Sequence, residues 1–245
     1  MVVDDVASAT SERLATAIEA AVKARGRAAL CLSGGSTPIP VFKYLATRAD
    51  LPWAKVSFAW GDERWVPHDH PDSNFRSARE LLLDHVPVPP QQVFPFPYGD
   101  DPQAAAEAYA ATLTSHFGVP QANSAIFDFN LLGMGPDGHT ASLFPGTGAA
   151  LRDDVAFALE VPGHGWRLTL SAKTLSASRE VLFAVSSRSK HNALATTWPQ
   201  EWGAAGRGPE TPTDQDLRSP AALDHFPARA ISATEKLIVI TDVQP

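Results

Sequence analysis

The chain has 245 residues, 44% of them hydrophobic and 19% charged. This length fits one large domain or two small ones, and the apolar content supports a sizeable core, which excludes a disordered or collagen-like protein. The 20 basic residues are scattered among 27 acidic ones, for a net charge of −7, so we expect no nucleic-acid partner. No apolar run predicts a membrane span. With a single cysteine, Cys31, and no signal-like N-terminus, the sequence predicts a cytoplasmic protein.

Segments typical of helices and strands alternate along the first half of the chain. Apolar residues at helical spacing predict a helix over 11–25 that ends at Gly26, and a short apolar run predicts a buried strand over 28–32. A helix over 38–48, a strand over 56–60 and a helix over 74–86 follow. The buried face predicted for the last helix comprises Phe75, Ala78, Leu81, Leu82 and His85. Prolines concentrated between 87 and 102 predict an extended loop.

The alternation continues to the end of the chain. The patterns predict helices over 103–117 and 189–198, a Gly/Pro-rich loop over 203–220, and strands over 126–132, 155–161, 167–170, 181–186 and 237–241. No linker interrupts the series, so we expect a single α/β domain, residues 1–245, with a mostly parallel sheet and helices on both faces. Two strands that follow closely within 150–170 indicate an antiparallel excursion on one sheet edge.

A glycine-rich turn, Ser33-Gly34-Gly35-Ser36-Thr37-Pro38, joins the first strand to the next helix. Thr37 suits an N-cap and Pro38 suits the first helical position. Glycines allow backbone N–H groups to face a ligand, and helix N-termini favour anions, which makes Gly34, Gly35, Ser36 and Thr37 candidates for phosphate binding. The turn lacks the Gly-Lys-Ser/Thr ending of a Walker A loop, and a tight turn without a ligand is the alternative.

Charged residues follow the second strand, in Gly61-Asp62-Glu63-Arg64-Trp65. Ligands of open α/β sheets bind beyond the carboxyl ends of strands, so Asp62 and Arg64 are candidate site residues, with Arg64 suited to a phosphate or a developing oxyanion. A solvated salt bridge is the alternative. The next loop contains residues with metal-ligand chemistry, namely His68, Asp69, His70 and Asp72. Helix capping by Asp72-Ser73-Asn74 is the better explanation, and we expect no metal.

A third loop, Gly133-Met134-Gly135-Pro136-Asp137-Gly138-His139-Thr140, follows the strand over 126–132. Its glycines match the dinucleotide pattern GxGxxG, but Pro136 removes a donor and Phe144-Pro145-Gly146 stops any long helix, so no nicotinamide or flavin is expected. His139 is a candidate base toward water, and Asp137 either orients it or holds a substrate hydroxyl. A structural histidine is the alternative reading.

Two basic residues later in the chain, Arg167 and Lys190, begin elements at positions from which a phosphate is reachable. Ordinary surface charge is the alternative for each. The sequence has no GxSxG elbow, so activated water is a simpler nucleophile than serine.

Taken together, these motifs resemble the 6-phosphogluconolactonase family. The resemblance rests on Leu32 to Pro38, Trp60 to Pro67 with Asp72-Ser73-Asn74, Leu132 to Pro145, Trp166 to Leu170 and the segment of Lys190, within about residues 28–195. It implies a Rossmann-like fold shared with glucosamine-6-phosphate deaminases, and cofactor-free hydrolysis of 6-phosphoglucono-δ-lactone in the pentose phosphate pathway. It also implies roles for residues: His139 as general base, Asp137 and Arg64 as its functional neighbours, and the turn Gly34–Thr37, Arg167 and Lys190 as phosphate ligands, with Asp62 among the substrate-binding residues.

Two other functions are weighed against this one. A glucosamine-6-phosphate deaminase/isomerase resembles the same loops, but its turn carries a glutamate before the proline, where this chain has Phe144, which cannot relay a proton. A non-catalytic sugar-phosphate sensor usually carries a DNA-binding domain, for which residues 1–27 are too short. The expected partner is a small sugar-phosphate lactone, with no membrane. The sequence leaves open the oligomeric state, for which a monomer is the working expectation, the donor to the oxyanion and the role of 203–220.

Overall fold

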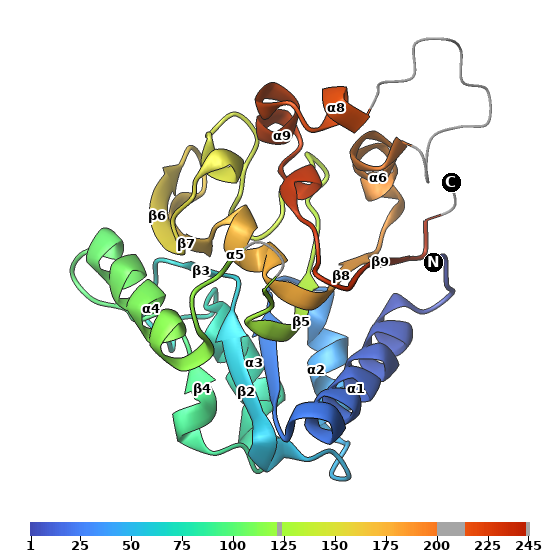
Figure 1. The fold of residues 1–245 in the computed structure, drawn as a ribbon, viewed down its shortest axis with the longest axis vertical. Helices are drawn as coiled ribbons and strands as arrows, with labels where there is room; N and C mark the ends of the chain where they lie inside the picture. Colours follow the sequence, from blue (N-terminus) through green and yellow to red (C-terminus); the bar gives the residue numbers. More distant parts are fainter. Residues whose placement is uncertain (122–123, 200–213, 244–245) are drawn as a thin grey trace.

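The computed structural model describes residues 1–121, 124–199 and 214–243. Within these ranges, a six-stranded sheet with strand order β4-β2-β1-β5-β8-β9 forms the centre of the fold (Figure 1). All neighbouring strands in it are parallel. Its strands are β1 (Ala28–Leu32), β2 (Val56–Trp60), β4 (Val93–Phe94), β5 (Phe127–Leu132), β8 (Ser178–Val185) and β9 (Lys236–Thr241).

The central strands are apolar because both of their faces are covered. Every residue of β1 and β2 is buried, as are the last four residues of β5, which is the pattern of a parallel sheet between helices. Cys31 is fully buried in β1, and burial raises the pKa of its thiol. Cys31 is therefore a core residue rather than a reactive one.

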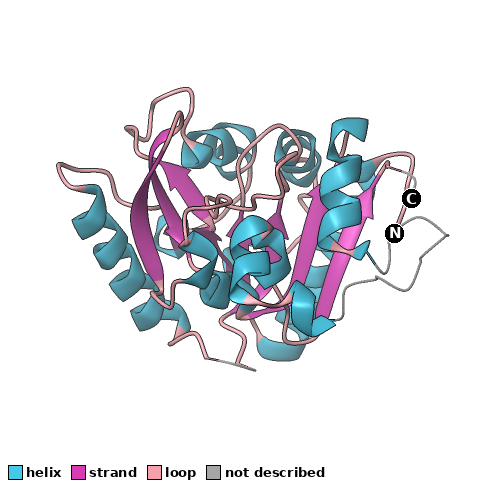
Figure 2. Cartoon of the chain, turned by 90° about the horizontal axis from the view of Figure 1, so that it is seen from above, coloured by secondary structure: helices cyan, strands magenta, loops and turns pink. Residues whose placement is uncertain are grey.

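Helices lie on both sides of the strands (Figure 2). Helix α1 packs against β1, β5, β8 and β9, whereas α4 packs against a second sheet. The helices are α1 (Val6–Arg25), α2 (Pro38–Ala46), α3 (Asn74–Leu81), α4 (Pro102–Phe117), α5 (Ala172–Ser176), α6 (His191–Thr197), α8 (Asp214–Leu217) and α9 (Pro220–His225). As predicted, Gly26 ends α1 in the left-handed conformation, with φ 75°.

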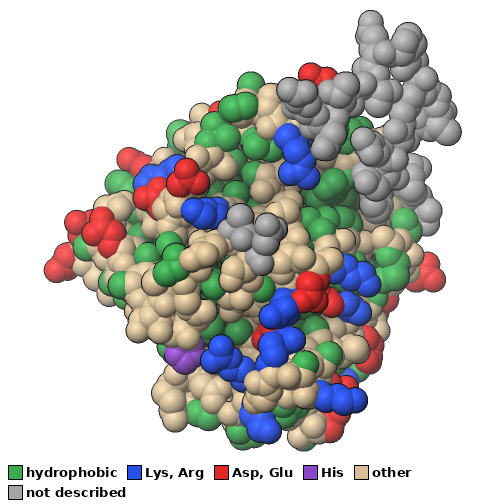
Figure 3. Space-filling view, viewed as in Figure 1, with side chains coloured by type: hydrophobic (Ala, Val, Ile, Leu, Met, Phe, Trp, Pro, Cys, Tyr) green, Lys and Arg blue, Asp and Glu red, His purple; other side chains and the backbone are tan. Residues whose placement is uncertain are grey.

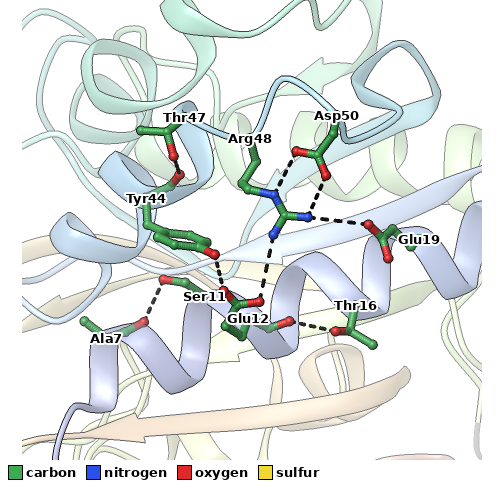
Figure 4. Close-up of polar contacts among 9 residues, drawn as sticks. All are labelled: Ala7, Ser11, Glu12, Thr16, Glu19, Tyr44, Thr47, Arg48 and Asp50. Carbon is green, nitrogen blue, oxygen red and sulfur yellow. Dashed lines mark hydrogen bonds and ion pairs between the residues drawn. The ribbon is translucent and has the colours of Figure 1, made fainter.

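A surface cluster centred on Arg48 connects α1 to the end of α2 (Figure 4). The Arg48 guanidinium donates to both carboxylate oxygens of Asp50, and its Nη2 lies 3.5 Å from Oε1 of Glu19. Tyr44 of α2 donates to the Glu12 carboxylate of α1. The pKa of Asp50 is held below its usual range, chiefly by the hydrogen bond from Arg48. These contacts fix the two helices against each other on the same side of the sheet.

Ion pairs gather at the amino ends of β5 and β8. Asp128 lies 2.6 Å from Arg25 Nη2 and 3.5 Å from Arg179 Nε, and its second oxygen accepts the Ala29 N–H at 2.8 Å. Glu180 pairs with Arg13. In the space-filling view, several Lys and Arg side chains lie close together over the middle and lower part of the molecule, and Asp or Glu side chains lie beside some of them (Figure 3). The amino end of the sheet is thus occupied by paired charges.

The segment 150–170 departs from the sequence prediction. Its two strands, β6 (Ala156–Val161) and β7 (Gly165–Leu170), are antiparallel as expected, but they do not extend an edge of the main sheet. They form a separate sheet of order β3-β7-β6 with β3 (Asp62–Arg64), a segment for which the sequence predicts a loop. A strand of three charged residues has no apolar pattern, so its pairing with β7 was not readable from the chain.

Other boundaries also differ from the predictions. The helix predicted over 74–86 ends at Leu81 and is followed by a 3-10 turn over Leu83–His85, which leaves His85 exposed rather than on the buried face. The loop predicted over 203–220 lies outside the described residues up to 213, and its remainder contains α8 and the start of α9. No helix in the described ranges is long and apolar enough to span a membrane.

Candidate active site

The direction in which successive strands are added to the sheet reverses between β1 and β5. From β1 it proceeds outward to β2 and β4, whereas from β5 it proceeds outward to β8 and β9. Such a switch point opens a crevice at the carboxyl ends of the strands. There the segments that follow β1, β2, β5 and β8 surround a cavity of about 410 Å³.

The glycine turn after β1 forms one wall of this cavity. Gly34, Gly35, Ser36 and Thr37 all line it. Gly35 has a φ of 93°, and a Cβ on Gly34 would lie 1.7 Å from Oδ1 of Asn74, so both positions require glycine. The expected N-cap role of Thr37 is not found, because its backbone is already helical and its side chain makes no capping bond.

The acid Asp62 lies at a buried part of the cavity wall. Its side chain is 8% exposed, and its Oδ2 accepts the Ser142 hydroxyl at 2.7 Å. Asn74 Nδ2 donates to the Asp62 carbonyl at 3.0 Å. Burial raises the pKa of Asp62, against the hydrogen bond from Ser142 and the positive charges of Arg64, His139 and Arg167. The carboxyl group of Asp62 can accept a hydrogen bond from a substrate hydroxyl in this environment.

Glu63, between the two candidate residues of β3, points away from the cavity into the start of α3. Its carboxylate accepts the backbone N–H groups of Arg64, Asn74 and Phe75, each at 2.8 Å, and the Ser73 hydroxyl at 3.0 Å. Burial raises the pKa of Glu63, and the three N–H donors oppose that effect. Ser73 caps α3 as predicted, by accepting from Arg76 N. Glu63 thereby fixes the position of β3 relative to α3.

The opposite wall of the cavity carries the pair formed by His139 and Asp137. Nδ1 of His139 lies 2.6 Å from Oδ1 of Asp137, and a Cβ on Gly135 would lie 2.1 Å from the same nitrogen. Burial acts to raise the pKa of Asp137, but the charge and hydrogen bonds of His139 outweigh it and the pKa is lowered. Because Asp137 is ionised at neutral pH, we assign the imidazole proton to Nδ1, which leaves Nε2 to accept a proton. His139 lines the cavity, and Asp137 holds it from behind.

Lys190 and Arg167 occupy different places relative to the cavity. Lys190 lines it, and its Nζ donates to the Met134 carbonyl at 2.6 Å. Burial lowers the pKa of Lys190, and Asp137 opposes this. Arg167 pairs with Arg64 across β7 and β3 and donates to the His164 and Trp166 carbonyls, so it lies beside the cavity wall rather than on it.

Arg64, by contrast, reaches the cavity. Its Nη1 donates to the Asp72 carbonyl at 2.7 Å, which holds the guanidinium close to the start of α3. The structure thus brings Gly34, Gly35, Ser36, Thr37, Asp62, Arg64, His139 and Lys190 around one space.

The loop with possible metal ligands is arranged around backbone partners. His68 Nε2 lies 2.7 Å from the Phe96 carbonyl, and His70 Nδ1 accepts the Asp72 N–H at 3.1 Å. In the part of the chain that the structure describes, no three His, Cys, Asp or Glu side chains are grouped around a possible metal position.

Sequence reasoning missed several residues of the cavity. Asn74, Met134, Ser187 and Ser189 line it, and Ser142 supports Asp62. Ser187 has a φ of 92°, and Asp242 at the end of β9 accepts its N–H at 3.0 Å. A non-glycine residue in this region of backbone space is often found at functional sites, but no sequence pattern predicts it.

The chain is similar in sequence to the proteins of one known family. The sequence model of the family described as glucosamine-6-phosphate isomerases/6-phosphogluconolactonase matches residues 2–216. A 6-phosphogluconolactonase of Synechocystis is 38% identical over 230 residues, covering 94% of this chain and 88% of its own. One from Mycobacterium leprae is 42% identical over 199 residues, with 76% and 79% covered.

Solved structures share the fold. The 6-phosphogluconolactonase of Thermotoga maritima superposes with a TM-score of 0.80 at 27% identity, over 98% of this chain and 97% of that one. A monomeric glucosamine-6-phosphate deaminase, at 19% identity and a TM-score of 0.73, shares the fold alone. The chain therefore belongs to the glucosamine-6-phosphate isomerase/6-phosphogluconolactonase family.

Proposed function

We propose that this chain hydrolyses 6-phosphoglucono-δ-lactone to 6-phosphogluconate, a step of the pentose phosphate pathway. The relatives named above are 6-phosphogluconolactonases. The observation that carries the proposal is the His139–Asp137 pair on one wall of a cavity whose other walls carry a glycine turn and Lys190. A lactone is an activated ester, so one base, one water and electrostatic stabilisation are enough for its hydrolysis.

The reaction begins at Nε2 of His139. This nitrogen takes a proton from water as the water oxygen attacks the lactone carbonyl carbon, which gives a tetrahedral oxyanion and an imidazolium. Asp137 stabilises the imidazolium through Nδ1. Collapse of the intermediate breaks the bond to the ring oxygen, and His139 returns its proton to that oxygen. The product is the open-chain acid, and His139 is again neutral.

The remaining cavity residues bind and position the substrate. Lys190 and the N–H groups of the turn Gly34–Thr37 bind the phosphate, because a backbone turn and a cation together favour an anion. Arg64 stabilises the oxyanion, and Asp62 accepts a hydroxyl of the substrate. Arg167 contributes positive charge from beside the cavity. Phosphate binding at a distance from the carbonyl supplies orientation at the reacting atoms.

The proposal extends to the protein as a whole. We place the activity in a single domain, residues 1–245, that acts in the cytoplasm as a monomer on a small molecule, without nucleic acid or a cofactor. The scattered basic residues and the net charge of −7 support the absence of a polyanion-binding surface.

The decisive experiment compares enzymatic with spontaneous hydrolysis. The δ-lactone is generated in situ and acid release is followed for the wild type, His139→Ala and His85→Ala, an exposed histidine that serves as the matched control. We expect the wild type and the control to accelerate hydrolysis, and His139→Ala to lose roughly 10²-fold or more in kcat, the contribution of a general base. Its affinity for 6-phosphogluconate should remain. Ammonia release from glucosamine 6-phosphate without lactone hydrolysis would instead assign the chain to the deaminases.

A further inference from the structure

Three aromatic rings from two distant segments form a stack beside the candidate base. The rings of His139 and Phe144 have centroids 4.4 Å apart and an interplanar angle of 26°. Phe144 also stacks on His164, with centroids 5.0 Å apart and an angle of 27°. Phe144 therefore contacts both imidazoles.

The third ring is held by the tip of the β6–β7 hairpin. Val161 and Gly165 are the last pair of this ladder, and the His164 N–H donates to the Val161 carbonyl at 2.9 Å. The side chain of Arg167, which lies within β7, donates to the His164 carbonyl. Gly163 and Gly165 both have positive φ values, 77° and 71°, which the tight tip requires. The position of His164 is thus set by backbone geometry.

The hydrogen bond to Asp137 fixes only one atom of the His139 ring. A ring held at Nδ1 alone is still able to tilt about that contact, and tilting moves Nε2, which has to reach the attacking water. A flat partner on the ring face removes this freedom, since aromatic pairs favour defined offsets and angles. We infer that Phe144 is a positioning residue that sets the plane of the His139 imidazole, and that His164 supports Phe144 through its own stacking contact.

The inference rests on the proposed function, and its test separates the two. Phe144→Leu keeps an apolar side chain of similar size but removes the stack, whereas Phe144→Tyr keeps the stack. Phe94→Leu is the matched control, because Phe94 also contacts a histidine ring, His116, at a centroid distance of 4.2 Å, but lies in β4 at the edge of the sheet.

We expect Phe144→Leu to lower kcat for the lactone roughly 3- to 10-fold, the range that an aromatic pair supports. KM and the affinity for 6-phosphogluconate should stay within about 2-fold, because the phosphate ligands are untouched. Phe144→Tyr and Phe94→Leu should retain wild-type kcat. His164→Ala should lower kcat less than Phe144→Leu, and adding it to Phe144→Leu should cause no further loss, because His164 acts through Phe144.

A second readout does not depend on activity. Because the two rings stack, the ring current of Phe144 should shift the His139 ring protons upfield in NMR spectra, and His139→Gln and His164→Gln assign the signals. Phe144→Leu should move the His139 signals downfield, and Phe144→Tyr should leave them in place. An unmoved His139 signal, wild-type kcat in Phe144→Leu, or a loss confined to KM would each overturn the inference. If the His139 signals move in Phe144→Leu as expected but the wild type hydrolyses no lactone, the proposed function is overturned and the stack stands.

Discussion

At the scale of single residues, Asp62 combines a position on the cavity wall with a cost to stability. Burial raises its pKa in the folded state, so the unfolded chain loses this proton at a lower pH than the folded one. The contribution of Asp62 to stability is therefore greatest below the ordinary carboxylate pKa and declines as pH rises through the raised value. Asp62→Asn removes this titration. We expect the free energy of unfolding of the variant, minus that of the wild type, to increase between pH 4 and pH 9, while kcat/KM falls.

Denaturant unfolding at several pH values checks this expectation, provided that the free energy of unfolding falls with denaturant concentration at the same slope in both proteins. A difference that decreases with rising pH would show that Arg64, His139 and Arg167 stabilise the ionised carboxylate by more than burial destabilises it.

A second prediction separates the two basic residues that the family resemblance implies as phosphate ligands. Lys190 lines the cavity, whereas Arg167 lies beside it and donates to backbone carbonyls. Lys190→Ala should raise KM for the phosphorylated lactone by about 10- to 100-fold, the range for a lost hydrogen bond to a charged group, with a smaller effect on kcat. Arg167→Ala should raise KM less. Steady-state kinetics with and without the substrate phosphate measures both, and a larger effect of Arg167→Ala would place the phosphate toward β7.

The candidate residues whose place beside the cavity could be predicted from the sequence are those that come shortly after a strand. Asp137 and His139 are two positions apart after β5, and Asp62 and Arg64 come directly after β2, so a sheet alone places them at one edge. Ser142 and Ser187 gave no such signal. Ser142 reaches Asp62 from 80 positions away, and Ser187 depends on a bond to Asp242. Contacts of this kind are set by tertiary packing, which a local pattern does not contain.

At the scale of elements, the turn between β1 and α2 depends on a close approach to α3. A Cβ on Gly34 would meet the Asn74 side chain at 1.7 Å, whereas a Cβ on Gly133, after β5, would meet nothing within 4 Å. Gly34→Ala should therefore displace Asn74 from Asp62 and destabilise the fold by about 1–3 kcal/mol, as overpacking of a tight site does. Gly133→Ala is the matched control. Thermal unfolding and KM for the lactone check the pair, and equal effects of both variants would contradict the close approach.

The central elements were predictable because each is long enough to show a period. The strands β1 and β2 have the expected bounds, and α1 and α4 differ from expectation only near their N-termini. The elements that were missed are short: β3 has three charged residues, and α9 begins at Pro220 within a Gly/Pro-rich stretch. Such segments take their conformation from neighbours, β7 for β3 and the turn after β5 for α9.

At the scale of the whole molecule, the C-terminal segment braces the turn that carries His139. Asp224 of α9 accepts the Gly146 N–H with its carbonyl at 3.0 Å and the Gly148 N–H with its Oδ1 at 2.7 Å. Ala228 donates to the Gly138 carbonyl at 3.2 Å. Because about 80 residues separate these partners along the chain, we expect the turn of His139 to reach its final geometry only when the last part of the chain has folded.

This coupling leads to the final prediction. Asp224→Ala leaves the Gly148 N–H without its carboxylate partner, and we expect a loss of about 1–2 kcal/mol in the free energy of unfolding. Asp153→Ala, at an exposed position near the same region, should cost much less. Lactonase activity of Asp224→Ala should be lost at a lower temperature than that of the wild type, while activity in the cold is largely kept. If the denaturation midpoints of both variants match the wild type, the segment after residue 214 does not brace the turn, and His139 is held by Asp137 and Phe144 alone.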